Sequence, residues 1–188
     1  MTAYYSEAEL RTLGFKRVGE QVSLSRKASV YGADRISIGD CVRIDDFCIL
    51  SAGVGGIEIH NHIHIGPYSG IMGGGKVTLE DYANISARVT IYSSNDDYSG
   101  SSMTNPTVPN DFKNVVDADV TIGKHVIVGC GAVILPGVTI AEGCAIGALS
   151  LMNVSAKPFE IHAGVPARLI KLRLRNLLEK EKLFVQTR

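Results

Sequence analysis

The chain has 188 residues, which is enough for one domain with a sizeable core. Its 19 basic and 19 acidic residues balance, so the composition predicts neither a nucleic-acid-binding protein nor a membrane-surface protein. Hydrophobic residues make up 45% of the chain, yet no apolar run approaches the ~20 residues that a membrane-spanning helix needs.

The N-terminal segment and the cysteines favour a cytoplasmic protein. The opening sequence MTAYYSEAEL lacks the basic-then-apolar pattern of a secretory signal. The four cysteines show neither CxxC spacing nor a zinc-binding pattern, and we expect all of them to be reduced. The same segment predicts a short helix over residues 4–14, with Ser6 as its cap, Glu9 completing a capping box and Gly14 as its end.

A six-residue period runs from about residue 28 to 156 and predicts the fold. Apolar residues recur every six positions, and a small or slim side chain stands four positions after each. A fixed short period indicates one small unit stacked repeatedly. Six is not a multiple of the helical repeat and the segments are rich in Ile and Val, so each unit is predicted to be a short strand. The most regular series is Ile122, Val128, Ile134, Ile140 and Ile146.

Three hexads per turn give an all-β fold, a three-sided parallel coil of about five turns whose strands would stack at ~4.8 Å. Face one begins at Ile38, Ile59, Leu79, Ile122 and Ile140. Face two begins at Ile44, Ile65, Ile85, Val128 and Ile146. Face three begins at Leu50, Ile71, Ile91, Ile134 and Met152.

The period is interrupted only between face three and face one. Short insertions occur at 53–56 and 73–76, and a long one covers 93–118. A loop of this length without its own period is usually functional or disordered, and its Asp, Asn, Ser and Pro content predicts a projecting surface loop. The repeats are followed by a predicted amphipathic C-terminal helix over 166–185.

The hexads, the excursion loop after Ile91 and the closing segment HAGVPARLIK (162–171) resemble the hexapeptide-repeat acyltransferases. The resemblance covers nearly the whole chain. It implies a left-handed parallel β-helix in a single domain, a homotrimer, and acetyl-CoA as co-substrate. The left hand comes from the family alone, because the general rule for parallel crossovers favours the right hand.

Within this family, three segments resemble enzymes that N-acetylate dTDP-4-amino-4,6-dideoxyhexoses in bacterial surface-polysaccharide pathways. Close relatives O-acetylate galactosides, maltose or serine. The segments are SIGDCVRIDDFCILSAG (37–53), YANISARVTIYSSNDDYSG (82–100) and NPTVP (105–109).

One departure from the relatives bears on the reaction. In the galactoside and maltose enzymes the segment matching IYSSND (91–96) ends in a histidine that deprotonates a sugar hydroxyl, whereas this chain has Asp96. A carboxylate is a much weaker base than an imidazole, but a neutral amine is already a good nucleophile. Asp96 therefore favours an amino-sugar acceptor. The resemblance also implies that Ser86 lies by the acceptor nitrogen and that a neighbouring subunit supplies Glu142, and it makes Arg88, Tyr92 and Asn105 plausible contacts to the sugar or nucleotide.

Two columns of residues on face two describe a candidate groove, polar in its first coils and smooth in its last. A sugar would suit the polar half and the pantetheine arm of CoA the smooth half, where Gly129, Gly147 and Ala148 would admit a ligand close to the backbone. The alternative is that glycine there is only a requirement of the repeat. The position before the apolar residue should point outward and holds Arg43, His64, Asn84, Ile127 and Ala145. The position after it holds Asp45, Gly66, Ser86, Gly129 and Gly147.

The CoA phosphates and the histidines complete the predicted site. Lys157, Pro166, Arg168 and Lys171 match the family's C-terminal lid against CoA, although an ordinary basic helix face is the alternative. His64 stands in HIGP, which resembles the His-Ile-x-Pro of sugar-nucleotide acetyltransferases and implies a place in the acceptor pocket.

The alternating histidines at 60, 62 and 64 would share one face of an extended segment, an arrangement that is compatible with a metal site. Their spacing differs from that of the zinc-dependent carbonic anhydrases of this fold. We therefore expect no metal, and expect the first two histidines to be solvated at the surface.

These features predict a trimeric acetyltransferase in which the amine of a nucleotide-linked sugar attacks acetyl-CoA directly, because no cysteine is obviously paired with a histidine and an acid. No nucleic-acid or membrane partner is expected. The enzymatic alternative is a sugar O-acetyltransferase with His64 as base. A non-catalytic β-helix scaffold or binding module is a further alternative, which the GVPAR segment (164–168) and the long loop argue against. A carbonic-anhydrase-like metal protein is the weakest alternative.

Overall fold

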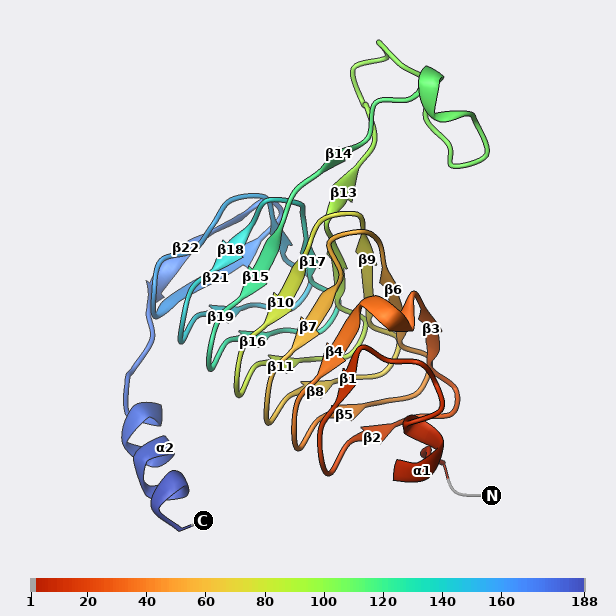
Figure 1. Cartoon of the computed structure of the whole chain (residues 1–188). Coiled ribbons are helices and arrows are strands. Elements are labelled where there is room, and N and C mark those ends of the chain that lie inside the picture. The colour runs from red at the N-terminus through yellow and green to blue at the C-terminus, as the bar shows by residue number, and fades with distance from the viewer. Residues whose placement is uncertain (1–2, 188) are drawn as a thin grey trace.

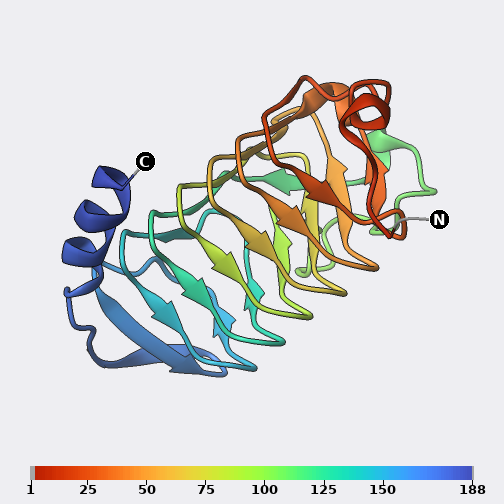
Figure 2. The same ribbon diagram turned by 90° about the horizontal axis from the view of Figure 1, so that it is seen from below.

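The computed structural model describes residues 3–187, which form a three-sided parallel β-helix (Figure 1). Figure 2 shows the coils stacked one behind another, with the N-terminal segment at one end and the C-terminal hairpin at the other. Each coil contributes one short strand to each face, and each strand pairs in parallel with the strands of the neighbouring coils. Because every coil buries its apolar residues against the next, a continuous aliphatic core runs along the axis.

The three sheets correspond to the three predicted faces. Face one contains β1 (Arg17–Val18), β4 (Ile36–Ile38), β7 (Ile57–Ile59), β10 (Val77–Leu79), β15 (Val120–Ile122) and β18 (Thr139–Ile140). Face two contains β2 (Ser23–Leu24), β5 (Arg43–Ile44), β8 (His64–Ile65), β11 (Asn84–Ile85), β16 (Ile127–Val128), β19 (Ala145–Ile146), β21 (Glu160–Gly164) and β22 (Ala167–Leu172). Face three contains β3 (Ser29–Tyr31), β6 (Ile49–Ala52), β9 (Gly70–Gly73), β12 (Thr90–Tyr92), β17 (Val133–Ile134) and β20 (Leu151–Met152).

The strand register confirms the predicted assignment of residues to faces. On face one, for example, Ile38 pairs with Ile59, Ile59 with Leu79, Leu79 with Ile122, and Ile122 with Ile140. These side chains are at most 2% exposed, so the six-residue period marks the residues that point inward. Two of the cysteines, Cys48 and Cys144, are buried at the small inward positions, and all four are free thiols as expected.

The expected number of coils, about five, is too small, because the stack holds about seven. An extra coil precedes the first predicted coil, which begins at Ile38: Val18, Leu24 and Val30 pair with Ile38, Ile44 and Leu50. A further partial coil follows it, where β21 pairs with β19. The N-terminal addition keeps the same six-residue spacing.

Backbone groups at the first corner, between faces one and two, are held by a ladder of side-chain hydrogen bonds. Asp40 accepts from the N–H of Glu20, Asn61 from that of Asp40, and Asp81 from that of Asn61, each at 2.8 Å. Each of these bonds links one coil to the next and satisfies an N–H that a turn would otherwise leave unpaired.

The third corner, between faces three and one, releases the excursion loop. The stem of this loop is a hairpin of β13 (Ser94–Asn95) and β14 (Val116–Asp117), followed outward by the 3₁₀ helix η2 (Asn110–Phe112). It projects well away from the β-helix, as the sequence predicts (Figure 1). At its root, a side chain on Gly74 would overlap the carboxylate of Asp117, so the glycine-rich insertion at 73–76 leaves room for the stem.

The N-terminal helix α1 (Glu7–Leu10) is shorter than the predicted 4–14 but has the predicted capping box of Ser6 and Glu9. Tyr4 pairs with Ser25 instead of entering the helix, and a 3₁₀ helix, η1 (Ala33–Arg35), precedes β4. None of the helices in the described range is long and apolar enough to cross a membrane.

The predicted C-terminal helix over 166–185 is wrong in its first half. Residues 167–172 form β22, which pairs antiparallel with β21 after a cis Val165–Pro166 bond. The edge of the last coil presents unpaired backbone groups that β22 satisfies, and this pairing overrides the helical pattern of the sequence. The helix α2 (Leu177–Gln186) begins only afterwards.

Helix α2 packs against a column of stacked rings at the first corner. Tyr82 stacks on His62 and His125 with ring centroids 5.2 and 4.8 Å apart, and Phe184 of the helix meets the edges of His62 and Tyr82. Glu181 pairs with His125 and Lys124. Burial raises the pKa of Glu181, but the hydrogen bonds from His125 and Lys124 outweigh it and leave the pKa below its ordinary value.

Candidate active site

The outer surface of face two has the predicted column of side chains in register. Arg43 pairs with His64, His64 with Asn84, Asn84 with Ile127 and Ile127 with Ala145. The last partial coil extends the column, because Ala145 pairs with Ile161. The column therefore changes from polar to apolar between Asn84 and Ile127, which are on adjacent coils.

The polar half is joined by a chain of hydrogen bonds. His64 Nε2 lies 2.8 Å from Asp45 Oδ2, and His64 Nδ1 lies 3.3 Å from Asn84 Oδ1. Arg43 Nε donates to the other oxygen of Asp45 at 2.7 Å. Burial raises the pKa of Asp45, but the hydrogen bonds from His64 and Arg43 outweigh it and hold the pKa below its ordinary value. Asp45 is absent from the predicted site residues, and only its place in the second column could have indicated it.

This chain restricts what His64 can do. Both of its ring nitrogens have hydrogen-bond partners within the protein, so neither is left to take a proton from a substrate. A general base needs a free nitrogen within hydrogen-bond reach of the proton that it removes. The geometry therefore supports a binding role for His64 and disfavours the O-acetyltransferase alternative, which needs it as base.

The glycines on face two pack closely against the next coil. A side chain on Gly129, in the smooth half, would come within 2.5 Å of the backbone nitrogen of Ala148, and one on Gly66, in the polar half, within 2.7 Å of that of Ala87. One on Gly147 would lie 2.8 Å from the Cβ of Ala163. Close packing of the coils thus favours glycine at 129 and 147, which supports the alternative to ligand approach, although Ser86 occupies the same repeat position one coil earlier. Ala148 is exposed beside this surface.

The predicted catalytic residues are not brought together within one chain. Ser86 is half-buried directly after β11, whereas Asp96 is exposed directly after β13, just beyond the paired stem of the hairpin. Face three, with β12, lies between them along the coil. Glu142 is half-buried at the first corner. The pKa of Lys124 is raised mainly by its hydrogen bond to Glu181 and also by the nearby charge of Glu142. Ser86, Asp96 and Glu142 therefore lie on different parts of one chain, and a site that uses all three would need a second chain.

The predicted sugar contacts are divided among the second corner, face three and the loop. Arg88 lies over the ring of Tyr68, 5.0 Å from its centroid, and Tyr92 is 38% exposed on β12. Asn105 caps its own turn, because its Oδ1 accepts from the backbone and hydroxyl of Thr107.

The predicted CoA contacts lie around the C-terminal hairpin. Lys157 and Pro166 are exposed before and between its strands, and Arg168 and Lys171 are exposed on β22. Arg173 was not predicted, and it is structural. Its Nη1 donates to the carbonyls of His125, Gly143 and Cys144 at 3.0–3.2 Å.

The two buried thiols are unsuited to nucleophilic catalysis. Burial is the main cause of a raised pKa at Cys48 and at Cys144. Each Sγ also donates to a backbone carbonyl, that of Gly66 and that of Lys157 respectively. A thiol becomes a nucleophile as its thiolate, so these two residues fit a structural role.

The three alternating histidines point to three different surfaces. His62 adopts a left-handed conformation, with φ of 57°, at the first corner, and this turn separates His60 on face one from His64 on face two. The expectation that they share a face is wrong because the segment is not extended. His62 is also half-buried in the ring column and not fully solvated.

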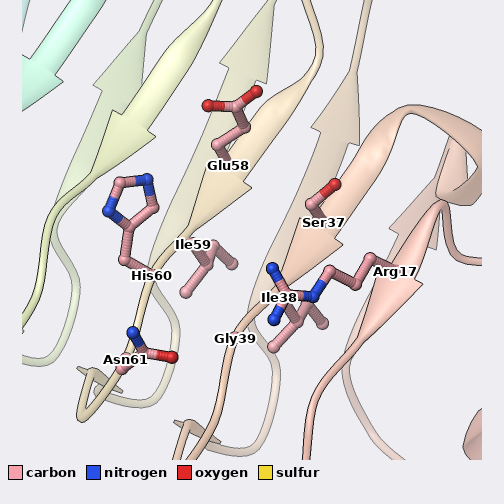
Figure 3. A pocket seen from close by; sticks show the side chains of 8 residues that line it. All are labelled: Arg17, Ser37, Ile38, Gly39, Glu58, Ile59, His60 and Asn61. Atoms are coloured by element: carbon pink, nitrogen blue, oxygen red, sulfur yellow. The ribbon is translucent and has the colours of Figure 1, made fainter.

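A separate hollow of about 370 Å³ lies on face one (Figure 3). Its walls carry Arg17, His60 and Glu58, and Glu58 is paired with Lys76 at 2.8 Å. Gly39 also lines the hollow, and a side chain at this position would lie 2.6 Å from the carbonyl oxygen of His60. None of the predicted site residues lines this hollow, so it is distinct from the groove on face two.

Comparison with known proteins identifies the class of this fold and site. Residues 119–153 match the family described as bacterial transferase hexapeptide (six repeats). An Escherichia coli protein, dTDP-4-amino-4,6-dideoxy-D-glucose acyltransferase, is 56% identical over 182 residues, which cover 97% of this chain and 95% of that one. Galactoside O-acetyltransferase of Escherichia coli strain K12 is 44% identical over only 52 residues, 28% of this chain and 26% of that one.

A solved structure agrees over the full length. AntD, an N-acyltransferase from Bacillus cereus in complex with dTDP and 3-hydroxybutyryl-CoA, is 44% identical, superposes with a TM-score of 0.95, and is covered to 98% by the whole of this chain. Other AntD structures replace one serine or one aspartate, ten positions apart, and two of them hold dTDP-4-amino-4,6-dideoxyglucose and coenzyme A. The chain therefore belongs to the hexapeptide-repeat acyltransferases. It is an acyltransferase with the left-handed parallel β-helix of that family.

Proposed function

We propose that this protein transfers the acetyl group of acetyl-CoA to the amino group of a dTDP-linked 4-amino-4,6-dideoxy sugar, for bacterial surface-polysaccharide synthesis in the cytoplasm. The observation that carries the proposal is the full-length likeness to an acyltransferase named for such a substrate. The division of face two into a polar and an apolar half supports the proposal, because a sugar suits the polar half and the pantetheine arm of CoA suits the apolar half.

Asp96 and Ser86 are the groups proposed at the acceptor nitrogen. They are ten positions apart, as are the serine and the aspartate replaced in AntD. The amine attacks the thioester carbonyl, the C–S bond breaks, and the thiolate leaves as the amide forms. Asp96 orients the amine, accepts the proton that nitrogen loses, and returns it to the departing sulfur. Positioning of the two substrates supplies most of the rate enhancement.

The site is proposed to lie between chains of a homotrimer. Face three separates Ser86 from Asp96 in one chain, and the hairpin that carries Asp96 projects away from its own coils (Figure 1). The hairpin of one chain would reach the face-two groove of its neighbour, with Glu142 also supplied across the interface. Ser86 of one chain and Asp96 of its neighbour would then both contact the amine of one sugar.

The CoA end of the groove is proposed to be the apolar half and the C-terminal hairpin. Pantetheine would lie along Gly129, Gly147 and Ala148, beside Pro166. The cations of Lys157, Arg168 and Lys171 would neutralise the phosphates. His64, Asn84, Arg88, Tyr92 and Asn105 would contact the nucleotide-linked sugar.

A side-by-side assay tests the function. The dTDP-linked 4-amino sugar and the matching 4-hydroxy sugar are each supplied with acetyl-CoA, and free thiol is followed. The amino sugar should react faster, and its rate should rise with pH until the amine is neutral, because its ammonium has a pKa of ~8–10 by analogy with other amines. Equal or faster reaction of the hydroxy sugar, lost in His64→Ala, would establish O-acetylation instead. Parallel reactions with 3-hydroxybutyryl-CoA decide the acyl group.

Mixed trimers test the shared site. Ser86→Ala and Asp96→Asn should each be impaired, and co-expressed chains should regain part of the activity because some interfaces combine two intact residues. No recovery, or light scattering that shows a stable monomer, would exclude a site of this kind.

A further inference from the structure

Three consecutive coils place Asp45, His64 and Asn84 in one hydrogen-bonded row on face two. The two links measure 2.8 and 3.3 Å. The side chain of Asp45 is only 13% exposed, while that of His64 is 43% exposed. Asp45 is also anchored from the other side by Arg43 and by the hydroxyl of Tyr4, which lies 3.5 Å from its Oδ1. The carboxylate is thus the fixed end of the row and the imidazole its accessible part.

The direction of these hydrogen bonds follows from the chemistry of the groups. An ionised carboxylate only accepts, so the Nε2 of His64 must carry a proton and donate it to Asp45. A charged ring would also donate from Nδ1 to the Oδ1 of Asn84, and a neutral ring would accept from the amide nitrogen instead. In either case, either the oxygen or the nitrogen of the Asn84 amide is hydrogen-bonded to His64. Among the hydrogen bonds of the described residues, the other end of the amide has no partner and remains for a ligand.

We infer that Asp45 is a positioning residue for the acceptor: it holds His64 through Nε2 and thereby fixes the amide of Asn84 toward the sugar. This inference rests on the proposed function, which places the acceptor in the polar half of face two. A pyranose hydroxyl both donates and accepts, so it suits either end of the amide. Without Asp45, His64 would lose its defined orientation, and the amide would turn freely.

The adjacent carboxylate offers a matched control. Asp46 accepts from Lys27 Nζ at 2.7 Å and from Ser25 Oγ at 2.5 Å, and it makes no hydrogen bond to His64 among the described residues. Its side chain is 38% exposed at the second corner. Asp45→Asn and Asp46→Asn therefore remove the same charge from neighbouring positions, and only the first changes the row.

The row itself is tested on the full-length protein without substrate, by NMR of ring nitrogens. In the wild type, His64 should show a protonated Nε2 coupled to a slowly exchanging proton. Asp45→Asn should abolish that signal and Asp46→Asn should preserve it, with both variants retaining the wild-type circular dichroism spectrum. A ring protonated only at Nδ1, or a signal unchanged in Asp45→Asn, would overturn the inference.

Steady-state kinetics test the consequence for the acceptor. Asp45→Asn should raise the KM for the amino-sugar nucleotide about ten- to a hundredfold, as expected for a charge-assisted hydrogen bond that positions a ligand. Its kcat and its KM for acetyl-CoA should change less than about twofold, and Asp46→Asn should behave as wild type. An unchanged acceptor KM in an active Asp45→Asn enzyme would refute the inference alone. A wild-type enzyme that acetylates no amino-sugar nucleotide would refute the proposed function as well.

Discussion

The two halves of face two have the same repeating backbone structure and differ in almost every outward side chain. In the first half, Arg43, His64 and Asn84 are linked into a polar row through Asp45. In the second half, the same register holds Ile127, Ala145 and Ile161 beside glycines. The inward residues are Ile or Val in nearly every coil of both halves, because they must fill the same core. The repeat therefore constrains the inside of the coil and leaves its outside to determine which ligand binds where.

The largest expected effect comes from the group proposed to act where the two halves meet. Asp96→Asn should lower kcat by ~10²–10⁴-fold, the usual contribution of an acid–base group, while the KM for acetyl-CoA stays near the wild-type value. Stopped-time thiol assays measure both. Asp97→Asn is the control, since Asp97 accepts hydrogen bonds from Ser99 and Ser102 within its own turn. Wild-type turnover in Asp96→Asn would remove this residue from the mechanism.

A change at the CoA end should produce the mirror image of the Asp45 effect. Arg168→Ala should raise the KM for acetyl-CoA about ten- to a hundredfold, because one charge-assisted phosphate contact is worth ~1.5–3 kcal/mol. The acceptor KM should stay unchanged. Lys182→Ala, an exposed cation on α2, controls for net charge. If the acceptor KM rises instead, the two halves of the groove are assigned in the wrong order.

The glycines of the apolar half provide a test of stability. Gly129→Ala should lower the free energy of unfolding by ~1–3 kcal/mol, because the new Cβ would press on the backbone of Ala148. Thermal unfolding followed by circular dichroism measures the loss. An unchanged midpoint combined with weaker CoA binding would show that Gly129 serves the ligand and not the stack.

The smallest effect is expected at the first corner, outside both halves. The folded pKa of Glu181 is lowered, so its contribution to stability is present above its unfolded pKa of ~4.3 and is lost as the pH falls through the lower folded value. The protection factors of α2 amides, which correct for the pH dependence of intrinsic exchange, should therefore fall below about pH 4, and Glu181→Gln should remove most of this fall. Acceptor and CoA binding at neutral pH should not change. A pH response that persists in Glu181→Gln would assign it to another group.

The regular part of the fold was predictable because its cause is local. Each inward residue must fill the same narrow core. The six-residue spacing alone therefore assigns Ile122, Val128 and Ile134 to their faces. The spacing of Val18, Leu24 and Val30 carried the same signal for the first coil. Strand β22 could not be predicted in this way, because its pairing depends on an edge that exists only after the last coil has formed.

The site was predictable as a surface but not as a set of contacts. The outward column on face two follows from the repeat, and the structure has it in register. The link from Asp45 to His64 depends on two side-chain conformations on adjacent coils, which spacing does not specify. The proposed meeting of Ser86, Asp96 and Glu142 would depend on neighbouring chains, which a single sequence describes only through resemblance.

The hairpin at the third corner has a consequence for how the chain folds and diverges. Contacts between neighbouring coils usually join residues about 20 positions apart, whereas Lys76 and Asp119, on either side of the hairpin, are 43 positions apart. Doubling the length of a flexible loop raises the entropy cost of closing it by only about 0.6 kcal/mol. Folding can therefore propagate from coil to coil across this junction with little delay. Segments of other lengths can replace the hairpin at small thermodynamic cost and without disturbing the stack.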